Sequence, residues 1–282
     1  MRFAPSCGEA RADLVSVATS LLLAAADAVD FAMDLAAYAQ KWDGIYGTED
    51  AELQKSRAER EWHSTWARLA PLADAPLRSL SERVPPQNVR CMDIGCGTST
   101  LGIDLCAAHN FGHLLLLDAS AVCIARHEAA AAGRTAPPAI TALVGDARVL
   151  PVPDGSYDVL IEKGTLDALD SAEDQRAMLA DCRRALAPSG LLLSIAFQNV
   201  RRLALLDAAL PPLGLTHHTH IVTSVDAPNA VVFVSLIFHS ASAHVPPYAP
   251  DERTKTMLAR VAASGSLWED AADFEVPDPF DS

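Results

Sequence analysis

The stretch CMDIGCGTST, Cys91 to Thr100, joins an apolar run to a segment with helical periodicity. Gly95 and Gly97 let the backbone turn sharply there and approach a bound ligand without side-chain collision. A nicotinamide-type fingerprint would need Gly or Ala at position 100, where this chain has Thr100. Asp93 lies shortly before the first glycine, where an acid repels a pyrophosphate but suits a ligand with an ammonium group. The stretch therefore predicts a strand, a glycine loop and a helix that bind a cationic ligand.

Around this stretch, short apolar runs alternate with helical patterns. The predicted strands are Val89–Ile94, His113–Leu117, Ala139–Val144, Asp158–Ile161, Leu191–Phe197, His220–Val225 and Val231–His239. The predicted helices are Thr100–Ala108, Ala121–Ala132, Ala172–Leu186 and Val200–Leu210. This alternation is typical of parallel strands joined by crossover helices. We therefore expect an α/β fold with a Rossmann-like, seven-stranded, mostly parallel sheet and helices on both of its faces.

Two turn signals refine this picture. Pro188-Ser189-Gly190 is a strong stop signal for the helix that ends near Leu186. Only Asp226-Ala227-Pro228-Asn229 separates the last two predicted strands, which leaves no room for a crossover helix. These two strands are therefore expected to form an antiparallel hairpin at the C-terminal edge of the sheet.

Composition limits the possible partners. The chain has 282 residues and a formal net charge of −14, and such a surface repels phosphate backbones, so nucleic acid is not an expected partner. The longest apolar run, Leu21 to Ala26, is far too short for a membrane span. The six cysteines form no CxxC pair, which is typical of reduced thiols in an intracellular protein. We expect a cytoplasmic protein that does not act at a membrane, with mitochondrial or other organelle targeting left open.

Two further acids follow the next two predicted strands. Asp118 lies about 20 residues beyond the glycines, where an acid accepts hydrogen bonds from both hydroxyls of a ribose. Asp146, in the sequence VGDA, follows the third strand within reach of an exocyclic amine. A ribose, an adenine amine and a cation describe S-adenosylmethionine rather than ATP or NAD. The alternative is a glycine turn with three capping aspartates, because Asp is common at helix N-caps.

A second informative stretch is EKGTLDAL, Glu162 to Leu169, at the end of the fourth predicted strand. With DIGCGTS, it makes the chain resemble the class I, seven-strand S-adenosylmethionine-dependent methyltransferases over roughly Trp42 to His239. Ser99 replaces the usual third glycine of their first motif. EKGTLDAL itself is similar to the signature of a lysine methyltransferase subgroup. That subgroup includes the enzymes that modify translation elongation factor and citrate synthase.

This resemblance implies a cofactor, a substrate and a set of site residues. The cofactor would be S-adenosylmethionine, and the substrate a protein that carries the target lysine. The implied cofactor-binding residues are Trp42, Asp93, Gly95, Cys96, Gly97, Asp118, Ala119, Asp146, Ala147 and Glu162. The implied catalytic residues are Asp167, Glu162 and Trp62.

The chemistry of lysine methylation explains why acids belong in this signature. A lysine ammonium has an unperturbed pKa of about 10.4, so it must lose a proton before it attacks a methyl group. We expect Asp167 to orient the amine, Glu162 to face the cofactor and Thr165 to cap the helix that follows. The alternative, a local salt bridge of Lys163 with either acid, is compatible with these roles. Trp62 would pack over the methionine moiety or line the lysine channel, unless it is a core residue.

The resemblance also divides the chain. Residues 61–245 are expected to form the methyltransferase domain, and residues 1–60 a helical extension before it. Residues 246–282 are expected to hold a proline-rich linker, a short helix and an acidic tail. The sequence does not indicate an oligomeric state.

Other functions stay open. His217-His218-Thr219-His220 has no acid or cysteine at ligand spacing, so no metal site is expected there. A small-molecule methyltransferase would use the same scaffold, because a fold does not determine a substrate. A non-catalytic cofactor-binding protein is the remaining alternative, in which the acidic tail would be the interaction element.

Overall fold

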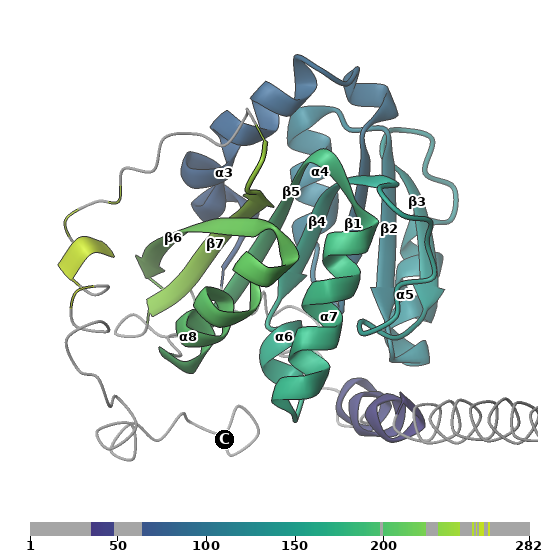
Figure 1. The fold of residues 1–282 in the computed structure, drawn as a ribbon. Helices are drawn as coiled ribbons and strands as arrows, with labels where there is room; N and C mark the ends of the chain where they lie inside the picture. Colours follow the sequence, from purple (N-terminus) through teal and green to yellow (C-terminus); the bar gives the residue numbers. More distant parts are fainter. Residues whose placement is uncertain are drawn as a thin grey trace, which may run out of the picture.

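The computed structural model describes residues 35–47, 64–197, 200–223 and 231–242, and near the end of the chain 250, 252, 254–256 and 259. Its centre is one sheet with helices packed on it (Figure 1). Trp62 lies outside the described residues, as do most of the N-terminal extension, the acidic tail and nearly all of the proline-rich linker. The expected domain boundaries therefore remain predictions.

The sheet has seven strands in the order β3-β2-β1-β4-β5-β7-β6. Their bounds are β1 Arg90–Ile94, β2 His113–Asp118, β3 Ala139–Val144, β4 Tyr157–Lys163, β5 Leu186–Phe197, β6 Leu215–Thr223 and β7 Val231–His239. Neighbouring strands are parallel except that β7 runs antiparallel to both β5 and β6. The predicted fold class is thus confirmed, and the strand order reverses between β1 and β4. In open α/β sheets, ligands bind beyond the carboxyl ends of the strands at such a reversal.

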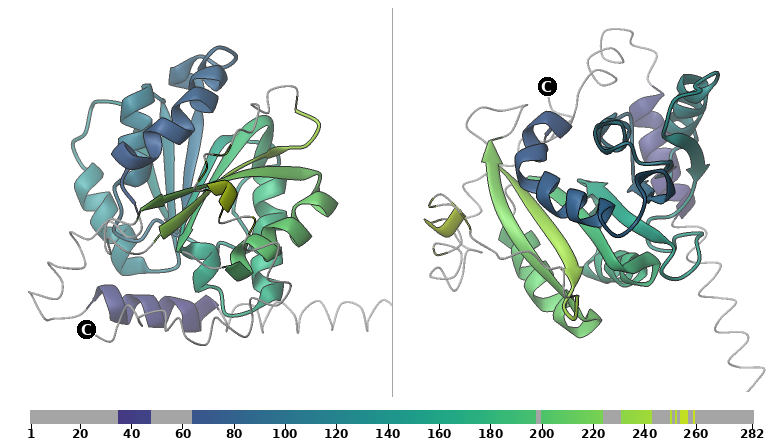
Figure 2. Two further views of the ribbon diagram at one scale, coloured as in Figure 1. Left: turned by 90° about the vertical axis from the view of Figure 1, so that its left-hand side faces the viewer. Right: turned by 90° about the horizontal axis from the view of Figure 1, so that it is seen from above.

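Helices cover both faces of the sheet, as Figure 2 shows. Their bounds are α3 Trp66–Ser81, α4 Leu101–His109, α5 Ala121–Ala131, α6 Thr165–Ala168, α7 Ala172–Ala185 and α8 Val200–Ala209, with short 3-10 helices η1 Pro86–Asn88 and η2 Pro211–Leu213. Residues of α3, α4 and α5 share one buried core with alternate residues of the strands, such as Val159 and Ile161. Residues of α6, α7 and α8 share the other core, where Leu160 and Leu192 point. Alternation along each strand therefore decides which helix layer a side chain meets.

Helix α3 is an element that the sequence patterns do not predict. It contains Pro71 and Pro76, and a proline inside a helix removes a hydrogen bond and crowds the preceding turn. The helix nevertheless forms, with Leu69, Ala73 and Leu77 fully buried against the sheet. Burial of this apolar face outweighs the local cost of the two prolines.

Two strands, β5 and β6, begin five residues earlier than expected. Pro188-Ser189-Gly190 lies inside β5, because α7 ends at Ala185 and the strand begins at once. The pairing jumps from Tyr157 with Leu186 to Val159 with Leu191, so these turn residues form an irregularity in the strand. Strand β6 begins five residues earlier than expected, which places His217 and His218 within it. The antiparallel pair β6–β7 is present, with β6 at the edge and β7 inside the sheet.

A helix over residues 35–46, called the covering helix below, lies beyond the carboxyl ends of the strands (Figures 1 and 2). Five cysteines, Cys91, Cys96, Cys106, Cys123 and Cys182, are buried free thiols, as expected for reduced cysteines. Among the described residues, no helix has the length and apolar character to cross a membrane.

Candidate active site

The glycine loop after β1 depends on two positive φ angles. Gly95 has φ 66° and Gly97 has φ 51°, a region that disfavours other residues. A Cβ at Gly95 would collide with the side chain of Thr165, and one at Gly97 would lie 2.7 Å from the Tyr46 hydroxyl. The backbone N–H groups of Gly95 and Cys96 donate to the carbonyl of Leu117, at 2.7 and 3.0 Å. Both glycines are therefore required by the loop itself and by the residues that approach it.

Asp118, at the end of β2, ties the loop to the next strand. Its carboxylate accepts hydrogen bonds from the backbone N–H groups of Gly97 and Ser120, each at 2.8 Å. Burial raises the pKa of this carboxyl, and the two backbone hydrogen bonds oppose that shift. An ionised carboxylate has about four acceptor sites, so Asp118 retains capacity for the hydroxyls of a ribose. Ala119, half-buried, follows it.

One end of the covering helix is fixed beside this loop. Asp43 accepts hydrogen bonds from the Ser120 hydroxyl at 2.5 Å and from the Val122 backbone at 3.2 Å. Arg126 donates to the carbonyl of Tyr46 at 2.7 Å. The ring of Trp42 stacks on that of Tyr46, with centroids 5.7 Å apart. Trp42 is thus brought next to the glycine loop through Tyr46.

The other end of the covering helix contacts the segment after α6. The Tyr38 hydroxyl accepts a hydrogen bond from the backbone of Asp170 at 3.0 Å, and Lys41 lies 3.9 Å from the Asp170 carboxylate. The guanidinium of Arg148 lies over the ring of Tyr38, 5.3 Å from its centroid. The covering helix therefore spans the sheet edge between the glycine loop and the EKGTLDAL segment.

Asp93, in β1, and Cys96, between the two glycines of the loop, both have buried side chains. Asp93 is 2% exposed and packs against α4, where a Cβ at Gly102 would lie 2.8 Å from one of its carboxylate oxygens. Gly102 thus leaves space for this acid. Cys96 is also buried, and desolvation raises the pKa of its thiol. That thiol is therefore neutral near pH 7, and its role is packing rather than nucleophilic attack.

Asp146 has a partner that the sequence did not suggest. Its carboxylate accepts hydrogen bonds from the guanidinium of Arg148, at 2.8 to 3.2 Å, and from the Arg148 backbone at 2.8 Å. Arg148 also donates to Asp174 at 2.8 Å. The carboxylate of Asp146 is therefore paired with Arg148 within the protein, and its contact with an adenine amine remains a prediction. Ala147, between the two partners, packs against the core.

The EKGTLDAL segment places Glu162 at the carboxyl end of β4, 1% exposed. Its carboxylate accepts hydrogen bonds from the Ser194 hydroxyl at 2.5 Å, from the Leu166 backbone at 3.2 Å and from the guanidinium of Arg202. Glu162 therefore satisfies an N–H group in the first turn of α6. Thr165 does not cap this helix, contrary to expectation. Its hydroxyl donates to the carbonyl of Ile94 at 2.8 Å and so ties α6 to the glycine loop.

Asp167, on α6, lies at the same cluster. Its carboxylate accepts a hydrogen bond from Arg202 at 3.1 Å, while its side chain stays 23% exposed. Desolvation raises its pKa to about 6, with Arg202 lowering it and Glu162 raising it. Arg202, which comes from α8, thus contacts both acids of the signature. A local salt bridge of Lys163 with either acid remains a prediction.

Sequence reasoning missed Arg202. It follows Glu162 by 40 residues and Asp167 by 35, across a strand and two helices. The only available signal was its place in the predicted helix Val200–Leu210, where a basic residue falls on the apolar side. A helical pattern alone does not say what a buried arginine will contact.

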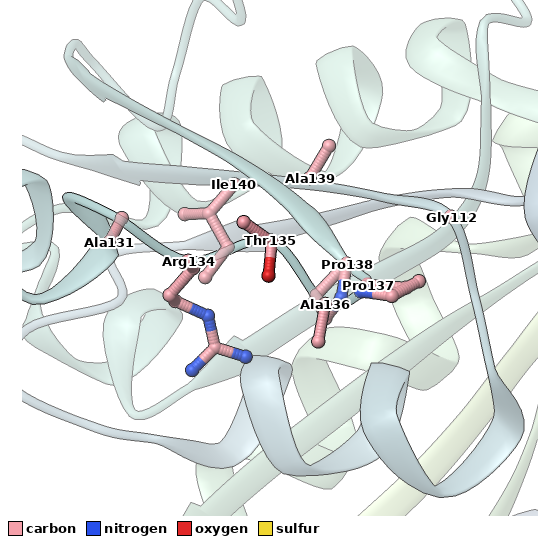
Figure 3. A pocket seen from close by; sticks show the side chains of 9 residues that line it. All are labelled: Gly112, Ala131, Arg134, Thr135, Ala136, Pro137, Pro138, Ala139 and Ile140. Carbon is pink, nitrogen blue, oxygen red and sulfur yellow. The ribbon is translucent and has the colours of Figure 1, made fainter.

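Two other features lie apart from this edge. The His217 ring contacts Asp207 at 3.0 Å and the Thr219 hydroxyl at 2.9 Å, and no group of three or more potential metal ligands occurs among the described residues. A pocket of about 360 Å³ lies at the start of β2 and β3, lined by Gly112, Arg134 and Pro138 among others (Figure 3). It is therefore at the opposite end of these strands from Asp118.

Known proteins provide a comparison. Residues 91–190 match a family model described as "Methyltransferase domain". The protein "EEF1A lysine methyltransferase 4" of Bos taurus is 30% identical over 169 residues, covering 55% of this chain and 59% of that protein. Its Mus musculus counterpart is 31% identical over 135 residues, covering 43% of this chain and 51% of that protein. The chain thus spans between half and three fifths of these curated relatives. A solved S-adenosylmethionine-dependent methyltransferase from Leishmania major aligns with a TM-score of 0.48 at 13% identity, covering 72% of this chain and 82% of that one.

Fold and site together define a class. A Rossmann-like sheet of seven strands, with a glycine loop after β1 and acids at the ends of β1, β2 and β4, is the arrangement found in class I methyltransferases. Residues 91–190, from β1 into β5, are the part of the chain that matches the methyltransferase family model. This class implies S-adenosylmethionine as cofactor, and the residues fit it: Asp118 beside Gly97 suits a ribose, and Asp93 suits a cation. The carboxylate of Glu162 is paired with Arg202 within the protein, so its contact with the cofactor remains a prediction.

Proposed function

We propose that this protein transfers a methyl group from S-adenosylmethionine to a lysine side chain of a protein substrate. The observation that carries the proposal is the position of Asp167. It is a partly exposed carboxylate at the sheet edge, and Thr165 in the same helix is hydrogen-bonded to the glycine loop. The substrate side and the cofactor side of the site are therefore parts of one connected unit. The similarity to two lysine methyltransferases supports the choice of lysine.

Each side of the site has a distinct task. Bound S-adenosylmethionine supplies an electrophilic methyl group. Asp118 and the loop at Gly97 would hold its ribose, and the buried carboxylate of Asp93 would lie beside its charged part. Glu162, paired with Arg202, would border the cofactor side of the site. The covering helix shields this region from water through Trp42 and Tyr46.

Asp167 would act on the nucleophile. Its negative charge attracts the lysine ammonium and orients the nitrogen toward the methyl group. The ammonium must release its proton before attack, and bulk water receives it, because Asp167 is partly exposed to solvent. Asp167 therefore selects and positions the amine, and no covalent intermediate with the protein is needed.

The experiment is to incubate the purified protein with S-adenosylmethionine labelled in its methyl group and with a cell lysate. Label in protein that appears as methyl-lysine after hydrolysis is the expected result. Label confined to small solutes would replace the proposal with a small-molecule methyltransferase. Cofactor binding by calorimetry without any transfer, in lysates from several sources, would indicate a non-catalytic binding protein.

A further inference from the structure

Arg202 is a buried cation at the centre of the candidate site. It lies in the first turn of α8 and is 2% exposed. Its guanidinium contacts the carboxylates of both Glu162 and Asp167, and donates to the Ser194 hydroxyl at 2.7 Å. Strand β5 thus contributes Ser194, β4 contributes Glu162, and α6 contributes Asp167 to one arginine.

The cluster engages its two carboxylates unequally. Glu162 is 1% exposed and accepts hydrogen bonds from three donors, whereas Asp167 stays 23% exposed and accepts from Arg202 on one oxygen. Asp167 is therefore the carboxylate of this cluster that a substrate ammonium would reach.

Anchoring of α8 does not explain why an arginine is buried here. The helix has other attachments, because Leu203 and Leu206 are buried in the core and Asp207 contacts His217 on β6 at 3.0 Å. The Nε atom of Arg202 is buried and makes no hydrogen bond within the described part of the chain. A buried ion pair with an unsatisfied donor adds little to stability compared with an apolar side chain.

We propose that Arg202 is a positioning residue that neutralises Glu162 and holds Asp167 ionised and aimed at the substrate amine. This rests on the proposed function. The other charged or titratable groups near Asp167 are Glu162 and Lys163 on β4, and Cys182 on α7, which faces the Glu162–Arg202 pair. Without the guanidinium, the negative charges of Glu162 and Asp167 repel each other. Asp167, the more exposed carboxylate, then takes up a proton near neutral pH.

The test compares Arg202→Met, Arg202→Lys and the matched control Arg201→Met, which changes an exposed arginine on the same helix. The first readout is the carboxyl carbon signal of Asp167 in a protein labelled with carbon-13 aspartate, assigned by its absence in Asp167→Asn. The Asp167 titration midpoint should move up by one pH unit or more in Arg202→Met. It should move less in Arg202→Lys, which keeps the charge, and should not move in Arg201→Met.

The second readout is the rate of methyl transfer to lysate protein between pH 6 and 9. Arg202→Met should be at least tenfold slower than wild type at pH 7 and should recover as pH rises. Arg202→Lys should restore part of the rate, while Arg201→Met should match wild type. An Asp167 midpoint unchanged in a folded Arg202→Met protein, judged by its melting curve, would overturn the inference. If the Asp167 midpoint moves in Arg202→Met but the wild-type protein labels no lysine, the proposed function is wrong. The effect of Arg202 on the ionisation of Asp167 would still be established.

Discussion

At the scale of single residues, Asp118 connects the glycine loop to the expected ribose position. Replacing it by alanine should weaken S-adenosylmethionine binding by about 1.5–3 kcal/mol, the typical loss for charge-assisted hydrogen bonds. Calorimetry measures this directly. Because Asp118 also receives the N–H groups of Gly97 and Ser120, Asp118→Asn is the control that keeps an acceptor there. Unchanged affinity in a folded Asp118→Ala protein would remove this residue from the cofactor site.

The raised pKa of Asp167 leads us to expect that the stability of the protein depends on pH. Its folded pKa of about 6 lies above the ordinary 3.8, so the folded protein holds this proton more tightly than the unfolded chain does. The stabilisation from that proton is therefore fully present below about pH 4 and is lost as pH rises through about 6. The asparagine in Asp167→Asn does not titrate, so this variant does not lose that stabilisation. Its free energy of unfolding, compared with that of wild type, should therefore increase by roughly 1–2 kcal/mol between about pH 4 and about pH 6.

Chemical denaturation of both proteins at several pH values measures this difference. A stability difference that stays constant from pH 4 to 7 would show that Asp167 titrates as it does in the unfolded chain. Both proteins share every other titrating group, so the contributions of groups that do not contact Asp167 cancel in the comparison.

Residue patterns predicted the acids of the site but not all of their partners. Asp93, Asp118, Glu162 and Asp167 do lie at the carboxyl edge, because their positions follow from strand ends. The ion pairs were not predictable. Arg148 binds Asp146 from two residues away, but the pattern alone does not give side-chain direction. Arg202 lies 35 residues beyond Asp167 in the sequence and 40 beyond Glu162, so local patterns could not show that it contacts them.

At the scale of elements, the covering helix is the part of the site that the sequence described least. Its place depends on contacts such as those of Asp43 with Ser120 and Val122. Asp43→Ala should release this end and lower cofactor affinity about tenfold, or roughly 1.4 kcal/mol, a typical loss for charged hydrogen bonds. Lys41→Ala, on the same helix, is the control, because its long, exposed ion pair contributes little.

Calorimetric binding with melting curves tests this role. Equal affinities for wild type and Asp43→Ala would mean that the covering helix does not take part in cofactor binding. Equal losses in Asp43→Ala and Lys41→Ala would point to a general disturbance of the helix.

Strands formed by continuous apolar or β-branched runs were predicted most accurately. β3 and β7 have the predicted bounds, since runs of β-branched and apolar residues between turn signals leave little freedom. α3 was missed because its prolines argue locally against a helix, whereas its stability comes from packing. Pro188 does mark an irregularity in the backbone, but this irregularity lies within β5 and does not separate the helix from the strand. In both cases tertiary contacts overrode a local signal.

At the scale of the whole molecule, the sheet brings one glycine loop and four acids to a single edge. The covering helix lies over that edge, and α8 supplies the arginine that contacts both Glu162 and Asp167. A cytoplasmic location and a protein substrate both remain predictions. The central claim is that this edge moves a methyl group to lysine by means of Asp167.

The most direct test is to measure labelled methyl-lysine formed in lysate protein by wild type and by Asp167→Asn. The isosteric change should lower turnover by about a hundredfold or more, as expected for a misplaced reacting group, while cofactor affinity barely changes. Melting curves show whether the variant is folded. A folded Asp167→Asn protein that forms methyl-lysine at the wild-type rate would contradict the account.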